Sequence, residues 1–212
     1  MSVLSRWRDR RRIRKTLEAR ARKRYIWNPT KKNRVTLKQR RAQVAEADRV
    51  IARHKDDTGA SKALKWALSQ VGVTEHPNGS NWGHPIQDWI KSTGYPGPVP
   101  YCACFATEAA THGGAPKLRN GYCPAILAGI GNFNRVATPR KGAFALFKFP
   151  GVSSATADHI GIVVSWTDST VTCVEGNTSP TSGGSQNNGG GVYLKTRPRS
   201  LVAGWIQPPY PA

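Results

Sequence analysis

A cysteine and a histidine stand where they could act as a nucleophile and its base. Cys102 opens the stretch CACFATEAATH, which is typical of a helix and follows the turn PGPVP. A thiol in the first turn of a helix faces unpaired backbone N–H groups and the positive end of the helix dipole. These lower its pKa and can also bind an oxyanion. His159 begins the apolar stretch HIGIVVSW, where strand packing gives no reason for a histidine.

Two polar residues near the end of the following stretch, TVTCVEGNTS, are placed to hold the imidazole. If the two stretches pair as neighbouring antiparallel strands, the end of the second lies opposite the start of the first. A carboxylate or an amide there fixes the tautomer of the ring and stabilises its cation. We therefore expect Cys102 as the nucleophile, His159 as the general base, and Glu175 or Asn177 as the group that orients the ring.

The other three cysteines, Cys104, Cys123 and Cys173, are interpreted as buried and unreactive thiols. No C-x-x-C spacing occurs, and no histidine clusters with the cysteines in the sequence, so a zinc site is disfavoured. In a reducing compartment disulfides are not expected either. The sequence predicts neither a metal nor a cofactor.

The elements that must position these residues are predicted to be helices followed by strands. Three stretches are typical of short helices: 61–72 with Ser61 as its N-cap, 85–94, and 102–112. Five apolar or alternating stretches then indicate strands: 142–149, 159–166, 170–176, 191–196 and 202–207. This order predicts an α+β fold with an antiparallel sheet.

Charge divides the chain into two parts. Residues 1–57 hold 20 Lys and Arg against 6 Asp and Glu, whereas residues 58–212 hold 12 against 6. We predict a basic helical N-terminal extension over 1–57 and a folded domain over 58–212. The extension would attract a polyanion, such as an anionic wall polymer, an anionic membrane surface or a nucleic acid.

Three stretches resemble the motifs of CHAP domains, the cysteine, histidine-dependent amidohydrolases and peptidases of bacterial and phage cell-wall lysis. The family's C-x-x-F pattern falls on residues 102–105, its H-x-G pattern on 159–161, and its E-x-N pattern on 175–177. The resemblance covers about residues 60–210. It implies a papain-like α+β fold with helices packed on an antiparallel sheet, and it makes Cys102 rather than Cys104 the nucleophile.

The chain departs from the family pattern upstream of the nucleophile. The D-x-D-G calcium loop of some members is missing, and PNGSNWG stands in its place, so no calcium is expected. Where some members carry Gln just before the nucleophile, this chain has Tyr101. Asn81, Trp82 and Tyr101 remain candidates for contact with a substrate.

The resemblance implies a monomeric peptidoglycan hydrolase that works without a cofactor. It would cut an amide bond of the stem peptide or cross-bridge, or the muramoyl-L-alanine link. The sequence shows no signal-peptide pattern and no apolar stretch long enough to span a membrane. We therefore expect an endolysin that stays in the host cytoplasm until a holin releases it, with a virion-borne lysin as the alternative.

A rival interpretation starts from the basic extension. The protein would then be a nucleic-acid-binding or structural virion protein whose CHAP-like domain is catalytically idle. The extension contains no recognisable nucleic-acid-reading motif, and Tyr25 and Trp27 are its only clustered aromatic residues, so binding of a nucleic acid is the weaker expectation.

Overall fold

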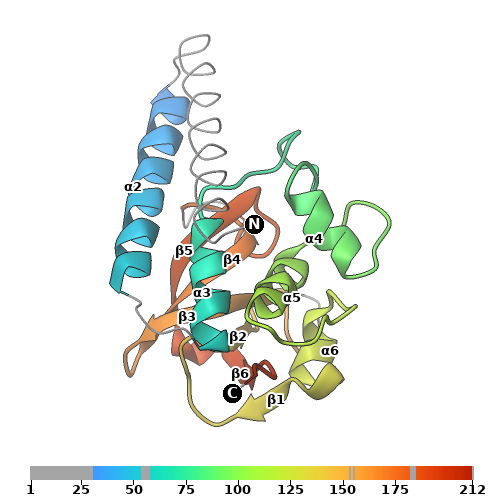
Figure 1. The fold of residues 1–212 in the computed structure, drawn as a ribbon. Helices are drawn as coiled ribbons and strands as arrows, with labels where there is room; N and C mark the ends of the chain where they lie inside the picture. The colour runs from blue at the N-terminus through green and yellow to red at the C-terminus, as the bar shows by residue number, and fades with distance from the viewer. Residues whose placement is uncertain (1–30, 54–57, 153, 155, 182–184, 212) are drawn as a thin grey trace.

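The computed structural model describes residues 31–53, 58–152, 154, 156–181 and 185–211 (Figure 1). Of the predicted basic helical extension over 1–57, residues 1–30 and 54–57 lie outside the described residues. The helices are α2 (Lys31–Arg53), α3 (Gly59–Ser69), α4 (Ile86–Ser92), α5 (Cys102–His112) and α6 (Cys123–Leu127), with short 3₁₀ turns at Ile130–Asn132 and Arg199–Leu201. The strands are β1 (Asn134–Val136), β2 (Phe144–Phe147), β3 (His159–Trp166), β4 (Thr170–Thr178), β5 (Gly191–Pro198) and β6 (Val202–Gln207).

The six strands form one antiparallel sheet in the order β1-β6-β2-β3-β4-β5. The predicted α+β fold with an antiparallel sheet is confirmed. Strands β2 to β6 match the five predicted stretches to within two residues at each end. Strand β1 has no comparable signal in the sequence, because its three residues, NRV, are mostly exposed and show no apolar alternation.

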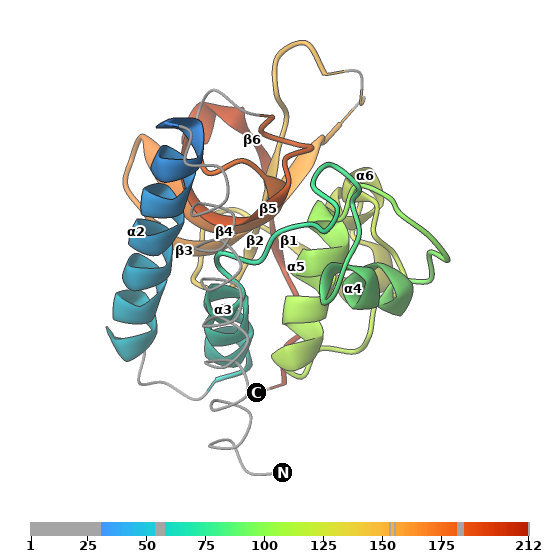
Figure 2. The same ribbon diagram turned by 90° about the horizontal axis from the view of Figure 1, so that it is seen from above.

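The two faces of the sheet pack into two separate apolar clusters. On one face Ile160, Ile162 and Val164 of β3 join the main core with helices α3 and α5, which lie side by side in Figure 2. On the other face Val163 belongs to a smaller apolar cluster. Because side chains alternate along a strand, His159 lies on the same face as Val163.

Helix α3 starts two residues before the predicted Ser61. Thr58 is the true N-cap: its Oγ1 accepts a hydrogen bond from the backbone N–H of Ser61 at 3.2 Å. The side chain of Ser61 is instead buried inside the first turn. Both residues are good capping residues, and the sequence alone does not decide between them.

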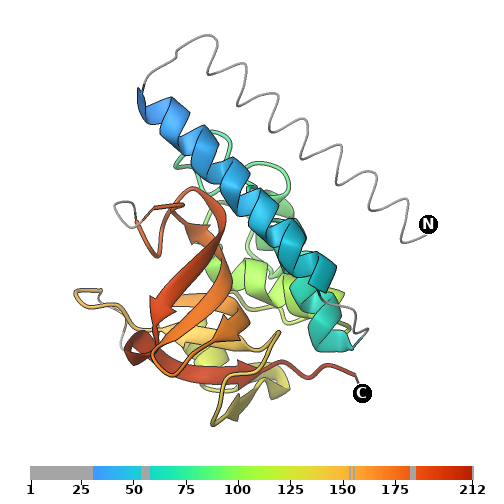
Figure 3. The ribbon, with the colours of Figure 1, turned by 90° about the vertical axis from the view of Figure 1, so that its left-hand side faces the viewer.

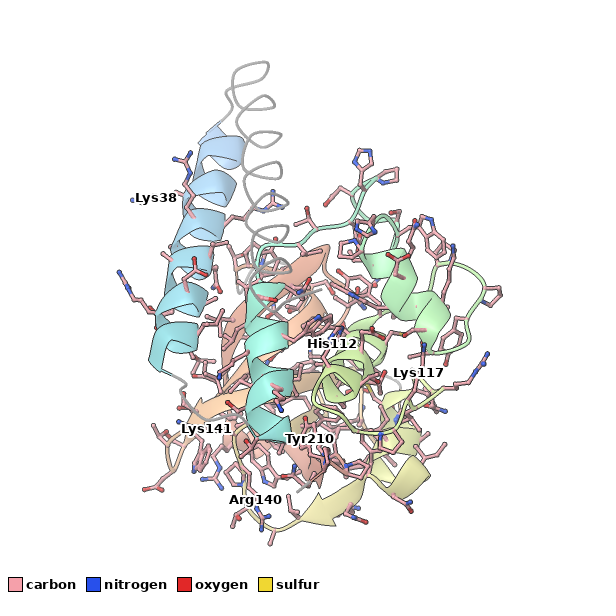
Figure 4. The ribbon with its side chains drawn as sticks, in the orientation of Figure 1. Lys38, His112, Lys117, Arg140, Lys141 and Tyr210 are labelled. Carbon is pink, nitrogen blue, oxygen red and sulfur yellow. The ribbon has the colours of Figure 1, made fainter. Side chains whose placement is uncertain are left out.

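Helix α2 lies beside α3 and the edge strand β5 (Figures 1 and 3). Among the side chains of α2 that the structure describes, Ala47 is fully buried, Val50 and Ile51 pack partly buried against the main core, and Lys38 is exposed on the outer side (Figure 4). Polar contacts add to this attachment. Arg40 Nη2 donates to Gly72 O at 3.1 Å and to Thr74 Oγ1 at 2.6 Å.

The side chain of Gln43 binds the free edge of the sheet. Its Nε2 donates to Leu194 O at 3.1 Å, and its Oε1 accepts from the Leu194 N–H at 2.8 Å. Strand β5 is the last strand of the sheet, so these backbone groups have no strand partner. The amide of Gln43 satisfies both of them, as the next strand would.

We expect Gln43→Ala to expose this edge. Loss of the two hydrogen bonds should lower the free energy of unfolding by about 1 kcal/mol and speed hydrogen exchange at the Leu194 amide. Gln39→Ala, one turn earlier on α2, is the matched control. Equal exchange at Leu194 in the two variants would contradict the assigned role.

Candidate active site

Cys102 is the first residue of α5. The turn before it ends at Pro100, and the helix begins with a hydrogen bond from the Phe105 N–H to Tyr101 O at 2.9 Å. Four alanines on α5 are fully buried and let the helix pack closely among its neighbours: Ala103, Ala106, Ala109 and Ala110. Helix α5 contacts α3, α4, β3 and β4, and this fixes its N-terminus against the sheet.

His159 and Glu175 form a buried hydrogen-bonded pair on neighbouring strands. His159 Nε2 lies 2.9 Å from Glu175 Oε2, and both side chains are fully buried. Cys102 and His159 lie near enough for the charge of each to shift the pKa of the other, while His159 Nδ1 is buried without a hydrogen-bond partner among the described residues. Since Nε2 is held by Glu175, Nδ1 is the ring nitrogen that remains to exchange a proton with the Cys102 sulfur. The structure thus brings together three of the four residues proposed for catalysis.

Gly161 makes room for this pair. A Cβ at this position would lie 2.6 Å from Cys173 Cβ and 2.8 Å from Glu175 Cγ, closer than such atoms approach. The missing side chain lets Glu175 lie across β3 toward His159, which stands two residues earlier on the same face.

We expect Gly161→Ala to push Glu175 away from His159. It should lower the free energy of unfolding by about 1–3 kcal/mol and reduce the activity of the site. Gly97→Ala is the control, because a Cβ there meets nothing within 4 Å. Urea unfolding of both variants measures the difference, and a Gly161→Ala protein as stable as the control would contradict the packing argument.

Arg197 of β5 holds Glu175 from the other side. Its Nε donates to Glu175 Oε1 at 2.8 Å, and its Nη2 donates to Glu175 Oε2. The guanidinium also lies 4.9 Å from the centre of the Phe149 ring. These two hydrogen bonds form a bidentate contact that fixes the orientation of the carboxylate, so that its Oε2 faces Nε2 of His159.

The surroundings favour a thiolate on Cys102 and a cation on His159. A hydrogen bond from Cys123, with contributions from His159 and the Ala103 amide, holds the pKa of Cys102 well below its usual value although burial opposes this. Burial would lower the pKa of His159, but the Glu175 carboxylate and the Cys102 sulfur outweigh it and raise that pKa to about 9. Both shifts favour the ion pair of thiolate and imidazolium over the neutral pair.

Glu175 remains ionised despite its burial. Burial raises the pKa of a carboxyl, but the charges and hydrogen bonds of His159 and Arg197 outweigh this and lower the pKa of Glu175. The site is thus a row of alternating charges: the Cys102 thiolate, the His159 cation, the Glu175 carboxylate and the Arg197 guanidinium.

Asn177 does not take the place of Glu175 as the partner of the imidazole. Its Nδ2 donates to Asn187 O at 3.1 Å, and its side chain is fully buried with a backbone φ of 57°. Of the two residues left open by the sequence, Glu175 binds the ring, and Asn177 ties the end of β4 to the loop before β5.

The three candidates for substrate contact lie in different settings. Tyr101 is fully buried, with its ring centre 6.3 Å from that of Trp89. Asn81 and Trp82 belong to the loop before α4, where Trp82 O accepts from the His76 N–H at 2.9 Å. Lys91 Nζ lies 5.3 Å from the centre of the Trp82 ring. These contacts hold Trp82 within its loop and pack Tyr101 against Trp89 of α4, and Asn81 stands in the same loop as Trp82 with a backbone φ of 52°.

Two residues of the site escaped the sequence interpretation. Arg197 stands in GVYLKTRP, where alternation places it on one face with Lys195 and Tyr193, and a cation on that face could have suggested a partner for Glu175. Cys123 is correctly expected to be buried, but its Sγ lies only 3.7 Å from Cys102 Sγ. Nothing in the spacing of the cysteines indicates that contact.

The described residues contain no group of three or more His, Cys, Asp or Glu side chains placed to hold a metal ion. Among their helices, none combines the length and the apolar character needed to cross a membrane.

Comparison of the chain with protein-family models, curated proteins and solved structures found no significant match. The interpretation of the site therefore rests on its own geometry and on the motifs in the sequence.

Proposed function

We propose that the protein is a cysteine-dependent amidohydrolase or peptidase that cleaves an amide bond of bacterial peptidoglycan. The observation that carries the proposal is the position of Cys102, at the N-terminus of α5, near the imidazole of His159, whose Nε2 is held by the buried Glu175. A helix that presents a thiol to an imidazole on an antiparallel sheet is the arrangement expected for a papain-like CHAP domain. The three motifs of that resemblance fall on these same residues.

In the proposed reaction each group takes one step. The Cys102 thiolate attacks the carbonyl carbon, and the carbonyl π electrons move to the oxygen, where backbone N–H groups at the start of α5 stabilise the charge. As the oxyanion collapses, the C–N bond breaks and the His159 cation gives its proton to the departing amine. The products of this half-reaction are a free amine and a thioester on Cys102.

Water completes the cycle. Neutral His159 takes a proton from the water, which attacks the thioester carbonyl, and the C–S bond breaks to restore the Cys102 thiolate. Glu175 holds the ring through both halves and stabilises its cation. Cys102 keeps 5% of its surface exposed whereas His159 is fully buried, so a substrate reaches the pair from the sulfur side.

Charge supports a wall polymer as the target. Residues 1–57 carry 20 Lys and Arg against 6 Asp and Glu, which suits binding to anionic wall polymers or to a membrane surface. In this proposal the chain acts as a monomeric lysin, held in the host cytoplasm until a holin opens the membrane or carried in the virion.

A gel containing purified peptidoglycan tests the function. The wild-type protein should clear the gel, and Cys104→Ala should clear it as well, because Cys104 lies deeper in α5 and has no assigned role. Absence of clearing by well-folded wild-type protein, combined with DNA binding that falls steeply with salt, would favour the rival nucleic-acid function. Mass spectrometry of the released fragments identifies the bond: a new amine on L-Ala indicates an amidase.

The ion pair predicts a pH profile. The rate should be nearly constant through neutral pH and fall above about pH 9, because His159, with a pKa of about 9, can then no longer protonate the amine. The raised pKa of His159 also stabilises the fold fully below its unfolded pKa of about 6.5, and this contribution is lost as pH rises through about 9. Initial rates and urea unfolding across this window measure both effects. A rate that rises through pH 9 would contradict the ion pair.

A further inference from the structure

A second thiol lies against the proposed nucleophile. Cys102 Sγ and Cys123 Sγ are 3.7 Å apart, which is contact distance for two sulfur atoms. They come from different helices, α5 and α6, and both side chains are buried, with exposed fractions of 5% and 6%. The hydrolytic mechanism gives Cys123 no proton to transfer and no substrate atom to bind.

The remaining cysteines lie in unreactive settings. Cys104 Sγ accepts a hydrogen bond from Thr93 Oγ1 at 3.1 Å, and burial raises its pKa to about 12. Cys173 is fully buried, and burial raises its pKa well above the usual value. The pKa of Cys123 is also raised, first by its hydrogen bond with Cys102 and then by burial, so what sets Cys123 apart from Cys104 and Cys173 is its contact with the nucleophile. An oxidant that reacts with thiolates therefore reacts first with Cys102, with the Cys123 thiol as its immediate neighbour.

We propose that Cys102 and Cys123 form an oxidisable pair, in which a hydroperoxide converts the nucleophile into a reversible disulfide with Cys123. The disulfide is the inactive form of the enzyme, and reduction by a thiol restores it. Loss of hydrolase activity on oxidation rests on the proposed function, whereas formation of the disulfide does not.

The chemistry balances with a hydroperoxide as the oxidant. The Cys102 thiolate attacks the outer oxygen of the peroxide, the O–O bond breaks, and an alkoxide or hydroxide leaves, giving a sulfenic acid on Cys102. The Cys123 sulfur then attacks the Cys102 sulfur, the S–O bond breaks, and water leaves with the thiol proton. The two sulfur atoms are together oxidised by two electrons, and the peroxide is reduced by two.

The geometry suits this second step. The sulfur atoms must approach from 3.7 Å to about 2.05 Å, a movement within reach of rotation about the two side chains. Cys123 lies on a five-residue helix, and Tyr122 beside it is 58% exposed, so α6 stands near the surface and is less enclosed than α5. Without Cys123 the sulfenic acid would have no resolving thiol and would proceed to the irreversible sulfinic acid.

The test treats the full-length protein with hydrogen peroxide and maps its peptides by mass spectrometry. We expect one disulfide between the peptides that contain Cys102 and Cys123, with the mass lower by two hydrogen atoms. Lytic activity should fall in proportion to the disulfide fraction and return on addition of dithiothreitol. Cys123→Ala and Cys123→Ser also lose the hydrogen bond that lowers the pKa of Cys102, so each variant is compared with itself before treatment. In both, peroxide should give sulfinic acid on Cys102, and the activity present before treatment should not return with dithiothreitol.

Cys104→Ala is the control and should behave as the wild type does. A wild-type protein that accumulates sulfinic acid on Cys102 while Cys123 stays free would overturn the proposal, as would a disulfide between any other pair. The mapping needs no substrate, so its result stands apart from the proposed function. A disulfide in a protein that never degrades peptidoglycan supports the pair and counts against the hydrolase.

Discussion

Cys102→Ala is expected to abolish peptidoglycan hydrolysis, with a fall in rate of at least about 10⁴-fold. Cys102→Ser should be almost as inactive. A serine hydroxyl is far less acidic than a thiol and stays protonated in this site, so the variant has no anionic nucleophile. Release of amino groups from purified wall material measures the rate. A variant that keeps even a tenth of the wild-type rate would remove Cys102 from the mechanism.

The same substitution has a second readout that does not depend on a substrate. The Cys102 sulfur helps to raise the pKa of His159 to about 9, so Cys102→Ala should lower that pKa. An NMR titration of the ring protons follows it directly. Cys104→Ala, with the same change of side chain two residues away, should leave the pKa of His159 as it is in the wild type. An unchanged titration in both variants would contradict direct coupling of sulfur and imidazole.

Arg197→Met is expected to cause the largest loss of stability. The guanidinium makes two hydrogen bonds to Glu175, whose side chain is fully buried. Removing it leaves a buried carboxylate with His159 as its only charged partner among the contacts described above. Breaking one side of a buried ion pair costs about 3–5 kcal/mol, so the free energy of unfolding should fall by about that amount.

The matched control for this variant is Arg140→Met. Arg140 is exposed at the surface (Figure 4), so the same change of side chain should alter stability by less than about 0.5 kcal/mol. Arg197→Lys keeps the positive charge but cannot donate two parallel hydrogen bonds to Glu175. Its free energy of unfolding should therefore lie between those of the two Met variants. Denaturant unfolding ranks the three variants. Equal stability of Arg197→Met and Arg140→Met would show that Glu175 does not depend on the guanidinium.

Arg197 should also influence the reaction through Glu175. In Arg197→Met the pKa of Glu175 should rise, because the charge that helps to hold it low is gone. Protonated Glu175 no longer stabilises the His159 cation, so the acidic limb of the activity profile should move toward neutral pH. A purely structural role for Arg197 would lower the amount of folded protein without moving this limb.

The sequence predicted those parts of the site that depend on local patterns. Cys102 at a helix start and His159 at a strand start are visible because each breaks the expected composition of its element. The pairing of His159 with Glu175 followed from the antiparallel order of two consecutive strands. The choice of Glu175 over Asn177 required the three-dimensional structure, because residues two apart on a strand share a face and compete for the same neighbour.

Contacts between distant segments were beyond the sequence. Arg197 reaches Glu175 from a strand that follows a long loop, and no local pattern reveals that side chains will meet across the face of a sheet. Cys123 meets Cys102 because α6 folds back beside α5, which is a matter of packing. The N-cap of α3 was misplaced for another reason: Thr58 and Ser61 satisfy the same local rule, and the rest of the fold decides between them.

The contact between Gln43 and the last strand has a consequence for solubility. An uncovered strand edge can pair with the same edge of another molecule, and the protein would then be prone to assemble into larger sheets at high concentration. One amide side chain on a basic helix blocks the middle of that edge, and the surrounding positive charge repels a second copy. The basic helix α2, part of the extension proposed to bind an anionic polymer, therefore also opposes association between copies of the protein.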